Sequence, residues 1–296
     1  MIRLESEYSQ TGGLPKEDTA IIRVLTRRDS RIEVLGRHIG VSLDLFSNTE
    51  ILEEPLLLVE NAQSDGWFYS FLFSSISAKR GRGLCRVEPR HGGGDDIVGV
   101  LETCIARKRV VVTLVDSDRL TPISVGNNKM KLVRKANRRS GWPLSVCDTP
   151  PCHEMENLVP FPVVLSMQCA LNNSANPVLS AICSHEEDSK SFRNRFWHFF
   201  DVKNGVVSEK VHKLTADEIS WLNEKLNISG ISISPDFTDN KYIPGYGSRV
   251  VDQLKADPDL QELFQKHVHD IDWRTAFDDF AEGVLPYFMG ATKRIT

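Results

Sequence analysis

The sequence lacks several features that would assign it to a common functional class. No apolar run approaches the length of a membrane span, and the N-terminus has no hydrophobic segment typical of a secretory signal. Neither a Gly-x-x-x-x-Gly-Lys-Ser/Thr loop nor a Gly-x-Ser-x-Gly elbow occurs, which argues against a P-loop nucleotide site and a serine hydrolase. Internal repeats, low-complexity tracts and coiled-coil heptads are also missing. We therefore expect a globular chain of 296 residues with no membrane partner.

Cysteine is sparse, and charge of neither sign dominates. The six cysteines are scattered, so we expect reduced thiols and a cytoplasmic location. Cys147, Cys152 and His153 resemble half of a zinc site, but no second ligand pair has a suitable spacing. A formal net charge of −4 argues against a globally basic nucleic-acid binder.

One segment is nevertheless strongly basic. Residues 129–139 (KMKLVRKANRR) contain no acidic side chain. A basic run of this kind is often a solvated helix face. Close to a cluster of carboxylates, it would instead suit a polyanionic substrate. The basic side chains of this segment are Lys129, Lys131, Arg134, Lys135, Arg138 and Arg139.

Two apolar segments end abruptly in acidic side chains. Residues 110–115 (VVVTLV) precede Asp116 and Asp118. Residues 56–59 (LLLV) precede Glu60 in the same way. Apolar runs of this length are typical of buried strands, and in an extended chain the residues i and i+2 point the same way. Asp116 and Asp118 are therefore predicted to converge on one cation, and Glu60 to lie at the same edge of a parallel sheet.

The fold class follows from an alternation of strands and helices. The sequence predicts an α/β fold with a parallel sheet flanked by helices, because strands that alternate with helices pair through right-handed crossovers. The turn at residues 92–96 (GGGDD) places aspartates where they can cap the following helix. The predicted strands are 56–59, 84–87 and 110–115, and the predicted helices between them are 66–76 and 97–106.

Three parts are expected along the chain. Residues 1–52 form an N-terminal extension, a hairpin or a strand–helix pair; residues 53–175 form the α/β core; and residues 176–296 form a mainly helical C-terminal region. Thr215 begins a capping box for one of its helices. The helices predicted there are 191–200, 215–226, 250–267 and 273–289.

The acidic motifs resemble those of the Toprim fold, which topoisomerases, primases and nucleases of the overcoming-lysogenisation-defect type share. The matching pieces are Leu57-Leu58-Val59-Glu60, Val115-Asp116-Ser117-Asp118 and the turn Gly92-Gly93-Gly94-Asp95. The segment 153–158 (HEMENL) resembles the Glu-x-Glu-Asn segment of a prokaryotic Toprim-like group associated with ABC-type ATPases in anti-phage defence. The resemblance covers roughly residues 55–160. In the family the glutamate is usually followed by glycine, whereas this chain has Asn61, a residue that tolerates a left-handed turn.

This resemblance implies a Toprim-like, Mg²⁺- or Mn²⁺-dependent endonuclease. Its substrate would be DNA or RNA, tRNA included, and its partner an ABC-type ATPase of a defence system. Carboxylates suit Mg²⁺, which prefers oxygen ligands, and the bound ion lowers the pKa of water and neutralises developing charge. The expected catalytic and metal-binding residues are Glu60, Asp116, Asp118 and Glu156, with Lys129, Lys131 and Arg134 holding substrate phosphates. Glu154 ranks lower than Glu156, because helical residues two apart face different sides.

Other interpretations of these residues stay open. Asp118 could cap the next helix, Glu60 could lie in a surface loop, and Gly92–Gly94 could be only a turn. Glu154 and Glu156 could be a solvated acidic pair. The main alternative function is a non-catalytic Toprim-like module that docks on an ATPase or on nucleic acid. Nucleotidyl or phosphoryl transfer to a small substrate would require a nucleotide pocket, which the sequence does not indicate.

Overall fold

The chain forms two compact units that interleave along the sequence. The computed structural model describes residues 21–26, 32–35, 38–47, 49–79, 84–167, 176–188, 192–234 and 241–290. One unit, here called the sheet unit, comprises Met1–Leu114, Lys131–Asp148 and Ala281–Thr296. The other, here called the helical unit, comprises Val115–Met130 and Thr149–Phe280. The boundaries after residues 52 and 175 stay a prediction. They divide the chain into consecutive parts, whereas each of the two units combines separate stretches of the chain.

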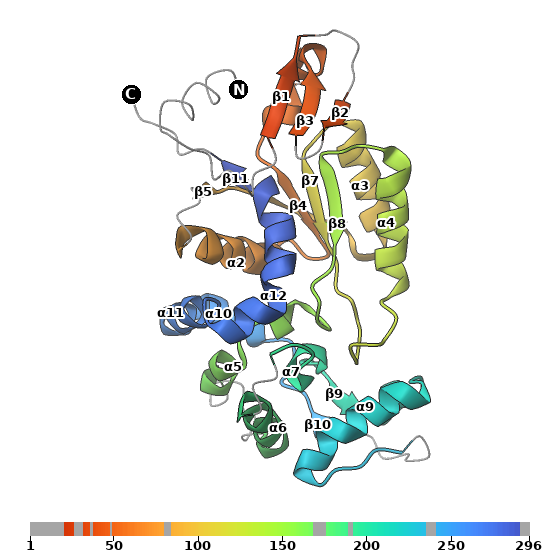
Figure 1. The fold of residues 1–296 in the computed structure, drawn as a ribbon, viewed down its shortest axis with the longest axis vertical. Coiled ribbons are helices and arrows are strands. Elements are labelled where there is room, and N and C mark those ends of the chain that lie inside the picture. The colour runs from red at the N-terminus through yellow and green to blue at the C-terminus, as the bar shows by residue number, and fades with distance from the viewer. Residues whose placement is uncertain are drawn as a thin grey trace. The chain divides into compact units, whose positions relative to one another are not determined.

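A four-stranded parallel sheet is the centre of the sheet unit (Figure 1). Each neighbouring pair of strands runs parallel, with Leu57 opposite Val112 in the central pair. The predicted α/β fold, with a parallel sheet, flanking helices and a helical C-terminal region, is therefore confirmed. In spatial order the strands are β6 (Glu88–His91), β4 (Leu56–Val59), β7 (Val111–Leu114) and β8 (Ser145–Asp148).

The strand order reverses direction in the middle of the sheet. The chain passes from β4 outward to β6, then returns to β7 on the other side of β4 and continues to β8. With right-handed crossovers, such a reversal puts α2 (Asp65–Lys79) on one face and α3 (Ile97–Ala106) and α4 (Asn128–Ser140) on the other, as Figure 1 shows. In open α/β sheets a ligand binds beyond the carboxyl ends of the strands at this point of reversal. Here that point lies between β4 and β7.

The buried core of this unit is almost wholly apolar. Every residue of β4 and β7 is buried. Helix α2 buries an aromatic face, and Phe73 packs against Phe288 with ring centroids 5.4 Å apart. This burial accounts for the apolar runs at residues 56–59 and 110–115, because a strand that is buried on both faces requires apolar side chains at every position.

The two edge strands of the parallel sheet, β6 and β8, were not predicted. The predicted second strand at residues 84–87 is wrong as a member of the parallel sheet: β5 (Leu84–Cys85) pairs with β11 (Met289–Gly290), and β6 pairs with β4 instead. The sequence of β6 is EPRH, and that of β8, which was not predicted, is SVCD. An edge strand buries little surface and tolerates proline, so neither carries an apolar pattern.

The glycine-rich turn after β6 has a structural role. A Cβ atom at Gly92 would meet the Val59 carbonyl oxygen at 2.8 Å, and the Gly92 amide donates to that oxygen at 2.7 Å. Gly93 and Gly94 have φ values of 72° and 64°, which favour glycine. Helix α3 begins where predicted, but the predicted aspartate cap is wrong: Asp96 occupies the N-cap position without a side-chain cap hydrogen bond.

A small separate sheet occupies the described part of the N-terminal extension. Its order is β1 (Ile21–Leu25), β3 (His38–Ser42) and β2 (Ile32–Leu35). Strands β2 and β3 are antiparallel, as a hairpin requires, whereas β1 pairs with β3 in parallel. Two short 3₁₀ helices, η1 (Leu43–Ser47) and η2 (Thr49–Leu52), follow. The remaining residues of the predicted 1–52 extension lie outside the described residues.

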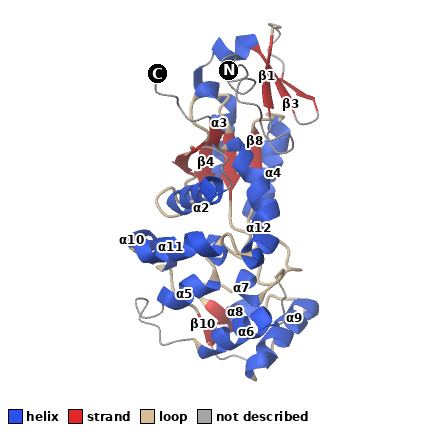
Figure 2. Ribbon diagram, turned by 60° about the vertical axis from the view of Figure 1, so that its left-hand side comes forward, coloured by secondary structure: helices blue, strands red, loops and turns tan. Residues whose placement is uncertain are grey.

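The helical unit consists mostly of short helices (Figure 2). Its only paired strands among the described residues are β9 (Gly205–Val207) and β10 (Lys241–Pro244). Across residues 21–290, wherever the structure is described, no helix has the length and apolar character needed to cross a membrane. The helical segments are η4 (Met155–Leu158), α5 (Phe161–Met167), α6 (Pro177–Asp188), α7 (Phe196–Phe199), α8 (Ser208–Val211), α9 (Ala216–Leu226), η5 (Asn227–Ser229), α10 (Val250–Ala256), α11 (Pro258–His267) and α12 (Ile271–Val284). The last residues of α12, from Ala281, and the short helix η6 (Leu285–Tyr287) belong to the sheet unit.

The predicted C-terminal helices are partly confirmed. Helix α9 begins at the expected capping box, with Thr215 and Glu218 exchanging hydrogen bonds. The predicted helix 250–267 is instead two helices, because Asp257 precedes Pro258 and caps α11. The predicted helix 191–200 is reduced, within the described residues, to α7, whose first amide is bound by the distant Glu186 carboxylate.

Candidate metal centre

Glu60 lies directly after β4, at the carboxyl end of the strand. It is half-buried. The turn that follows does not use the expected left-handed backbone, because Asn61 does not have a positive φ. Instead the Asn61 side chain accepts a hydrogen bond from the Gln63 amide at 2.9 Å, and its own amide donates to Asp65. Asn61 therefore forms an Asx turn that leads into α2.

Asp116 and Asp118 follow β7, in the helical unit, but their side chains differ in environment. Asp116 is half-buried, and its Oδ1 accepts the Met155 amide hydrogen bond at 3.0 Å. Asp118 is exposed with φ of 54°, so the extended backbone assumed for convergence ends before it. The side-chain amide of Asn127 joins the two residues. Its Nδ2 atom donates to the Asp116 carbonyl at 3.0 Å and to Asp118 Oδ2 at 2.7 Å. Asp118 as a metal ligand stays a prediction.

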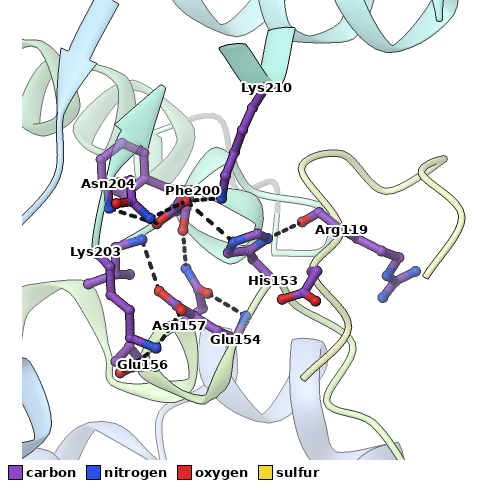
Figure 3. Close-up of polar contacts among 12 residues, drawn as sticks. Arg119, His153, Glu154, Glu156, Asn157, Phe200, Lys203, Asn204 and Lys210 are labelled. Carbon is purple, nitrogen blue, oxygen red and sulfur yellow. Dashed lines mark hydrogen bonds and ion pairs between the residues drawn. The ribbon is translucent and has the colours of Figure 1, made fainter. Parts of the chain in front are cut away.

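The segment 152–159 is completely buried, although four of its residues are polar or charged: His153, Glu154, Glu156 and Asn157. Backbone carbonyls and aromatic donors hold it in place. Asn157 Nδ2 donates to the carbonyls of Trp197 and Phe200, at 2.6 and 2.8 Å (Figure 3). The Trp197 indole in turn donates to the Val159 carbonyl at 3.0 Å. The aromatic cluster at residues 196–200 is buried, and it fixes the loop that carries the acidic residues.

Glu154 and Glu156 share one cation. Lys203 Nζ lies 2.9 Å from Glu154 Oε2 and 3.3 Å from Glu156 Oε1 (Figure 3). The reason for ranking Glu154 below Glu156 does not hold, because Glu154 is extended (φ −143°, ψ 173°) and precedes the short helix η4 rather than lying within a helix. Residues two apart can then face the same group. The expectation of a solvated acidic pair is also wrong, since both side chains are buried.

Burial has a marked effect on these charges. Burial and the neighbouring Glu154 together raise the pKa of Glu156 to about 7, against the opposing effect of Lys203. Glu156 is 2% exposed, and its Oε2 atom has no hydrogen-bond partner among the described residues. The pKa of Lys203 is raised, since the carboxylates of Glu156, Glu154 and Asp116 outweigh the burial that would lower it. Asp116 therefore belongs electrostatically to the same cluster as the two glutamates.

A second group of potential ligands lies beside the first. His153, Glu154 and Asp201 each offer one ligand atom, and these atoms lie within 4.8 Å of one another. All three side chains are buried. Among the described residues this is the sole group of three or more His, Cys, Asp or Glu side chains that is close enough to hold a metal ion. The chain can therefore hold a metal ion at this position.

A tight turn positions Asp201 and Lys203. Asp201 Oδ1 accepts the Asn204 amide hydrogen bond at 2.7 Å, and the Asp201 carbonyl accepts that of Gly205 at 2.7 Å. A Cβ atom at Gly205 would overlap the Ile243 carbonyl oxygen, and Gly205 has φ of 82°. Burial would raise the pKa of Asp201, but hydrogen bonds from Lys210 and Asn204 lower it below its ordinary value. Asp201 therefore stays ionised within the protein.

The basic side chains proposed to hold phosphates lie on α4. Lys129 is half-buried and engaged in an interaction, and Lys131 is exposed. Arg134 lies 3.2 Å from Asp148, at the end of β8, so part of its charge is already balanced. Their role in substrate binding stays a prediction.

The half zinc site seen in the sequence does not gain support. Cys147 belongs to the sheet unit and Cys152 to the helical unit. Burial raises the pKa of Cys147 to about 11, and it raises that of Cys152 well above its ordinary value. Both thiols are thus poorly disposed to ionise, as a metal ligand must.

Sequence reasoning identified only part of this group of acidic residues and their partners. His153 and Glu154 lie in the quoted HEMENL segment, where the dense sequence of polar residues beside Pro150 and Pro151 was a usable signal. Asp201 and Lys203 were not singled out, because nothing in their local pattern indicates that they approach residues about 50 positions earlier. Lys210, which contacts Asp201, was not singled out either.

The chain matches no protein-family model, no curated protein and no solved structure. Functional inference therefore depends on the geometry of the acidic cluster, here defined as Asp116, His153, Glu154, Glu156 and Asp201, and on its two lysines, Lys203 and Lys210.

Proposed function

We propose that this protein is a Mg²⁺- or Mn²⁺-dependent endonuclease of Toprim-like type that cleaves phosphodiester bonds of DNA or RNA. The observation that carries the proposal is the hydrogen bond between Asp116 Oδ1 and the Met155 amide, 3.0 Å long. It joins the acidic turn after β7 to the HEMENL segment, as a shared site of Asp116 and Glu156 requires. Glu60 follows β4, the strand next to β7, at the point where the strand order reverses.

The donor set suits a hard divalent cation. Asp116 and Glu156 offer carboxylate oxygens, which Mg²⁺ and Mn²⁺ prefer. The unpartnered, buried Oε2 atom of Glu156 is the clearest sign of a missing partner, because a buried oxygen without one costs free energy. Asp116 and Glu156, with Asp118, would hold the ion; when bound, such an ion polarises a phosphodiester and lowers the pKa of water. The role of Glu60 as a ligand stays a prediction.

The chain's own residues would carry the remaining roles. Lys203 is 38% exposed at its side chain, so its ammonium can reach solvent while the two glutamates orient it. Lys129, Lys131 and Arg134 on α4 would hold substrate phosphates, since basic side chains supply most of the affinity for nucleic acid. An ABC-type ATPase partner of an anti-phage defence system follows from the resemblance to the Toprim-like group.

The test is cleavage of DNA and RNA substrates, tRNA included, in the presence of Mg²⁺ or Mn²⁺. Asp116→Asn and Glu156→Gln should each lower the cleavage rate by at least about 100-fold, equivalent to roughly 2.7 kcal/mol of lost transition-state stabilisation. Asp252→Asn, at an exposed position of α10, is the matched control and should leave the rate unchanged. Cleavage by the Asp116 and Glu156 variants at the control rate would refute the nuclease assignment.

One observation favours a second candidate, a non-catalytic module that docks on an ATPase or on nucleic acid. Lys203 balances both glutamates, an arrangement that also suits a purely structural ion-pair network. Calorimetry separates the two functions. Heat on Mn²⁺ addition that disappears in Asp116→Asn supports the nuclease; no heat, with nucleic-acid affinity intact in that variant, supports the docking module.

A further inference from the structure

The His153 ring is held in one orientation by the backbone. Its Nδ1 atom lies 2.9 Å from the Arg119 carbonyl oxygen, which can only accept, so Nδ1 carries the proton (Figure 3). Nε2 then presents a lone pair toward Asp201 Oδ2, 3.8 Å away. That separation is too long for a hydrogen bond. His153 and Asp201 are 3% and 1% exposed at their side chains, so water does not readily separate them.

Two electron-rich atoms that face each other in a buried site are best explained by a cation between them. A histidine whose Nδ1–H donates to a carbonyl and whose Nε2 points into a ligand group has the usual orientation of a metal-bound imidazole. Glu154 supplies a third ligand atom within 4.8 Å of the other two. The Glu154 side chain is fixed by the Val202 amide, which donates to Oε1 at 3.1 Å.

We propose that His153, Glu154 and Asp201 form a binding site for a transition-metal dication of the Zn²⁺ class, distinct from the Mg²⁺ carboxylates of the proposed nuclease. Imidazole nitrogen favours Zn²⁺ over Mg²⁺, which takes oxygen ligands. Three protein ligands leave a fourth position for water or a substrate oxygen, as in catalytic zinc sites. The proposal does not depend on the nuclease assignment.

Two lysines balance the site in the metal-free protein. Lys210 Nζ contacts Asp201 Oδ2, and Lys203 Nζ contacts Glu154 Oε2. Both lysine side chains are more than one third exposed, so each ammonium can move into solvent when a dication replaces it. The lysines should therefore compete with the metal, and removal of one of them should strengthen metal binding.

The experiment is calorimetric titration of the full chain with Zn²⁺ and, separately, with Mg²⁺. Loss of an outer-shell partner of a metal ligand costs about 10–100-fold in affinity, so loss of a ligand in His153→Asn should cost more than about 100-fold for Zn²⁺. The matched control His212→Asn, at an exposed histidine, should bind Zn²⁺ like the wild type. Lys210→Met should bind Zn²⁺ several-fold more tightly. Opposite shifts in the His153 and Lys210 variants cannot come from a general loss of folding.

A spectroscopic measurement identifies the ligands. Co²⁺ bound at this site should give the visible bands of a nitrogen- and oxygen-coordinated ion, and His153→Asn should abolish them. A sulfur-to-cobalt charge-transfer band would overturn the proposal, because it would show that cysteine binds the ion. Equal Zn²⁺ affinity in wild type and His153→Asn would overturn it as well. Asp116→Asn should retain Zn²⁺ binding, so loss of cleavage in that variant and loss of the zinc site are distinguishable.

Discussion

Strands β4 and β7 and the segment 152–159 are buried to the same extent, yet different interactions hold them. The strands bury aliphatic side chains such as Leu58 and Val112, and each neighbour adds a small, non-directional gain. The segment 152–159 buries His153, Glu154 and Glu156, which are stabilised by individual partners with defined distances. The first region should tolerate changes of shape, whereas the second should respond to the loss of any one partner.

The largest effect is expected in the apolar region. Leu58→Ala removes a side chain that is 0% exposed, and it should lower the free energy of unfolding by about 2–5 kcal/mol, through lost burial and a residual cavity. Leu52→Ala, at a side chain that is 59% exposed, should change it by no more than about 0.5 kcal/mol. Urea denaturation measures both. Similar losses in the two variants would contradict the assignment of β4 to the core.

A smaller but coupled effect is expected in the polar region. Asp201→Asn leaves Lys210 without its counter-ion and should cost about 1–3 kcal/mol, moderated because the lysine is partly exposed. The double variant Asp201→Asn with Lys210→Met should lose less than the sum of the two single losses. A double-mutant cycle from denaturation curves gives the coupling energy. Strict additivity would show that the two side chains act independently.

The smallest effect depends on pH. Glu156 has an ordinary pKa of 4.5 and a pKa of about 7 in the folded protein. Between these values the folded chain holds a proton that the unfolded chain releases, so stability falls as the pH rises through this window. Glu156→Gln removes this loss and should be more stable than wild type above pH 7 by about 1–2 kcal/mol in metal-free buffer, with no gain at pH 4.

Denaturation curves at several pH values test this dependence. Glu224→Gln, at an exposed position of α9, is the matched control and should show no such trend. A stability difference for Glu156→Gln that does not change with pH would contradict the raised pKa.

The parts of the fold that were predictable are those with local signals. Residues 56–59 and 111–114 are central strands whose apolar runs mark them, and Thr215 marks the start of α9. The edge strands β6 and β8 carry no such run, because only one neighbour and little burial define them. The Asp257-Pro258 pair indicates the break between α10 and α11. The helical periodicity of the surrounding residues favoured one continuous helix instead.

The site was predictable only in part, for a physical reason. Asp116 was predicted from the apolar run that precedes it, and Glu156 from the resemblance of its segment to Glu-x-Glu-Asn. The Met155 amide, which donates to Asp116, joins the two segments. Asp201 and Lys203 come from a turn about 50 residues further along the chain, and their position is set by Asn204 and the approach of β10. No local pattern records a contact of that kind. Glu154 was misjudged because its segment was assumed to be helical.

The close approach at Gly205 has a consequence for how this protein can vary. Because any side chain there would collide with the Ile243 carbonyl, a replacement would push β9 and β10 apart and shift the turn that bears Asp201 and Lys203. Homologues that preserve the acidic cluster should accordingly keep glycine at 205 even where the surrounding surface diverges. Such a glycine would serve as a signature for recognising distant members of the lineage.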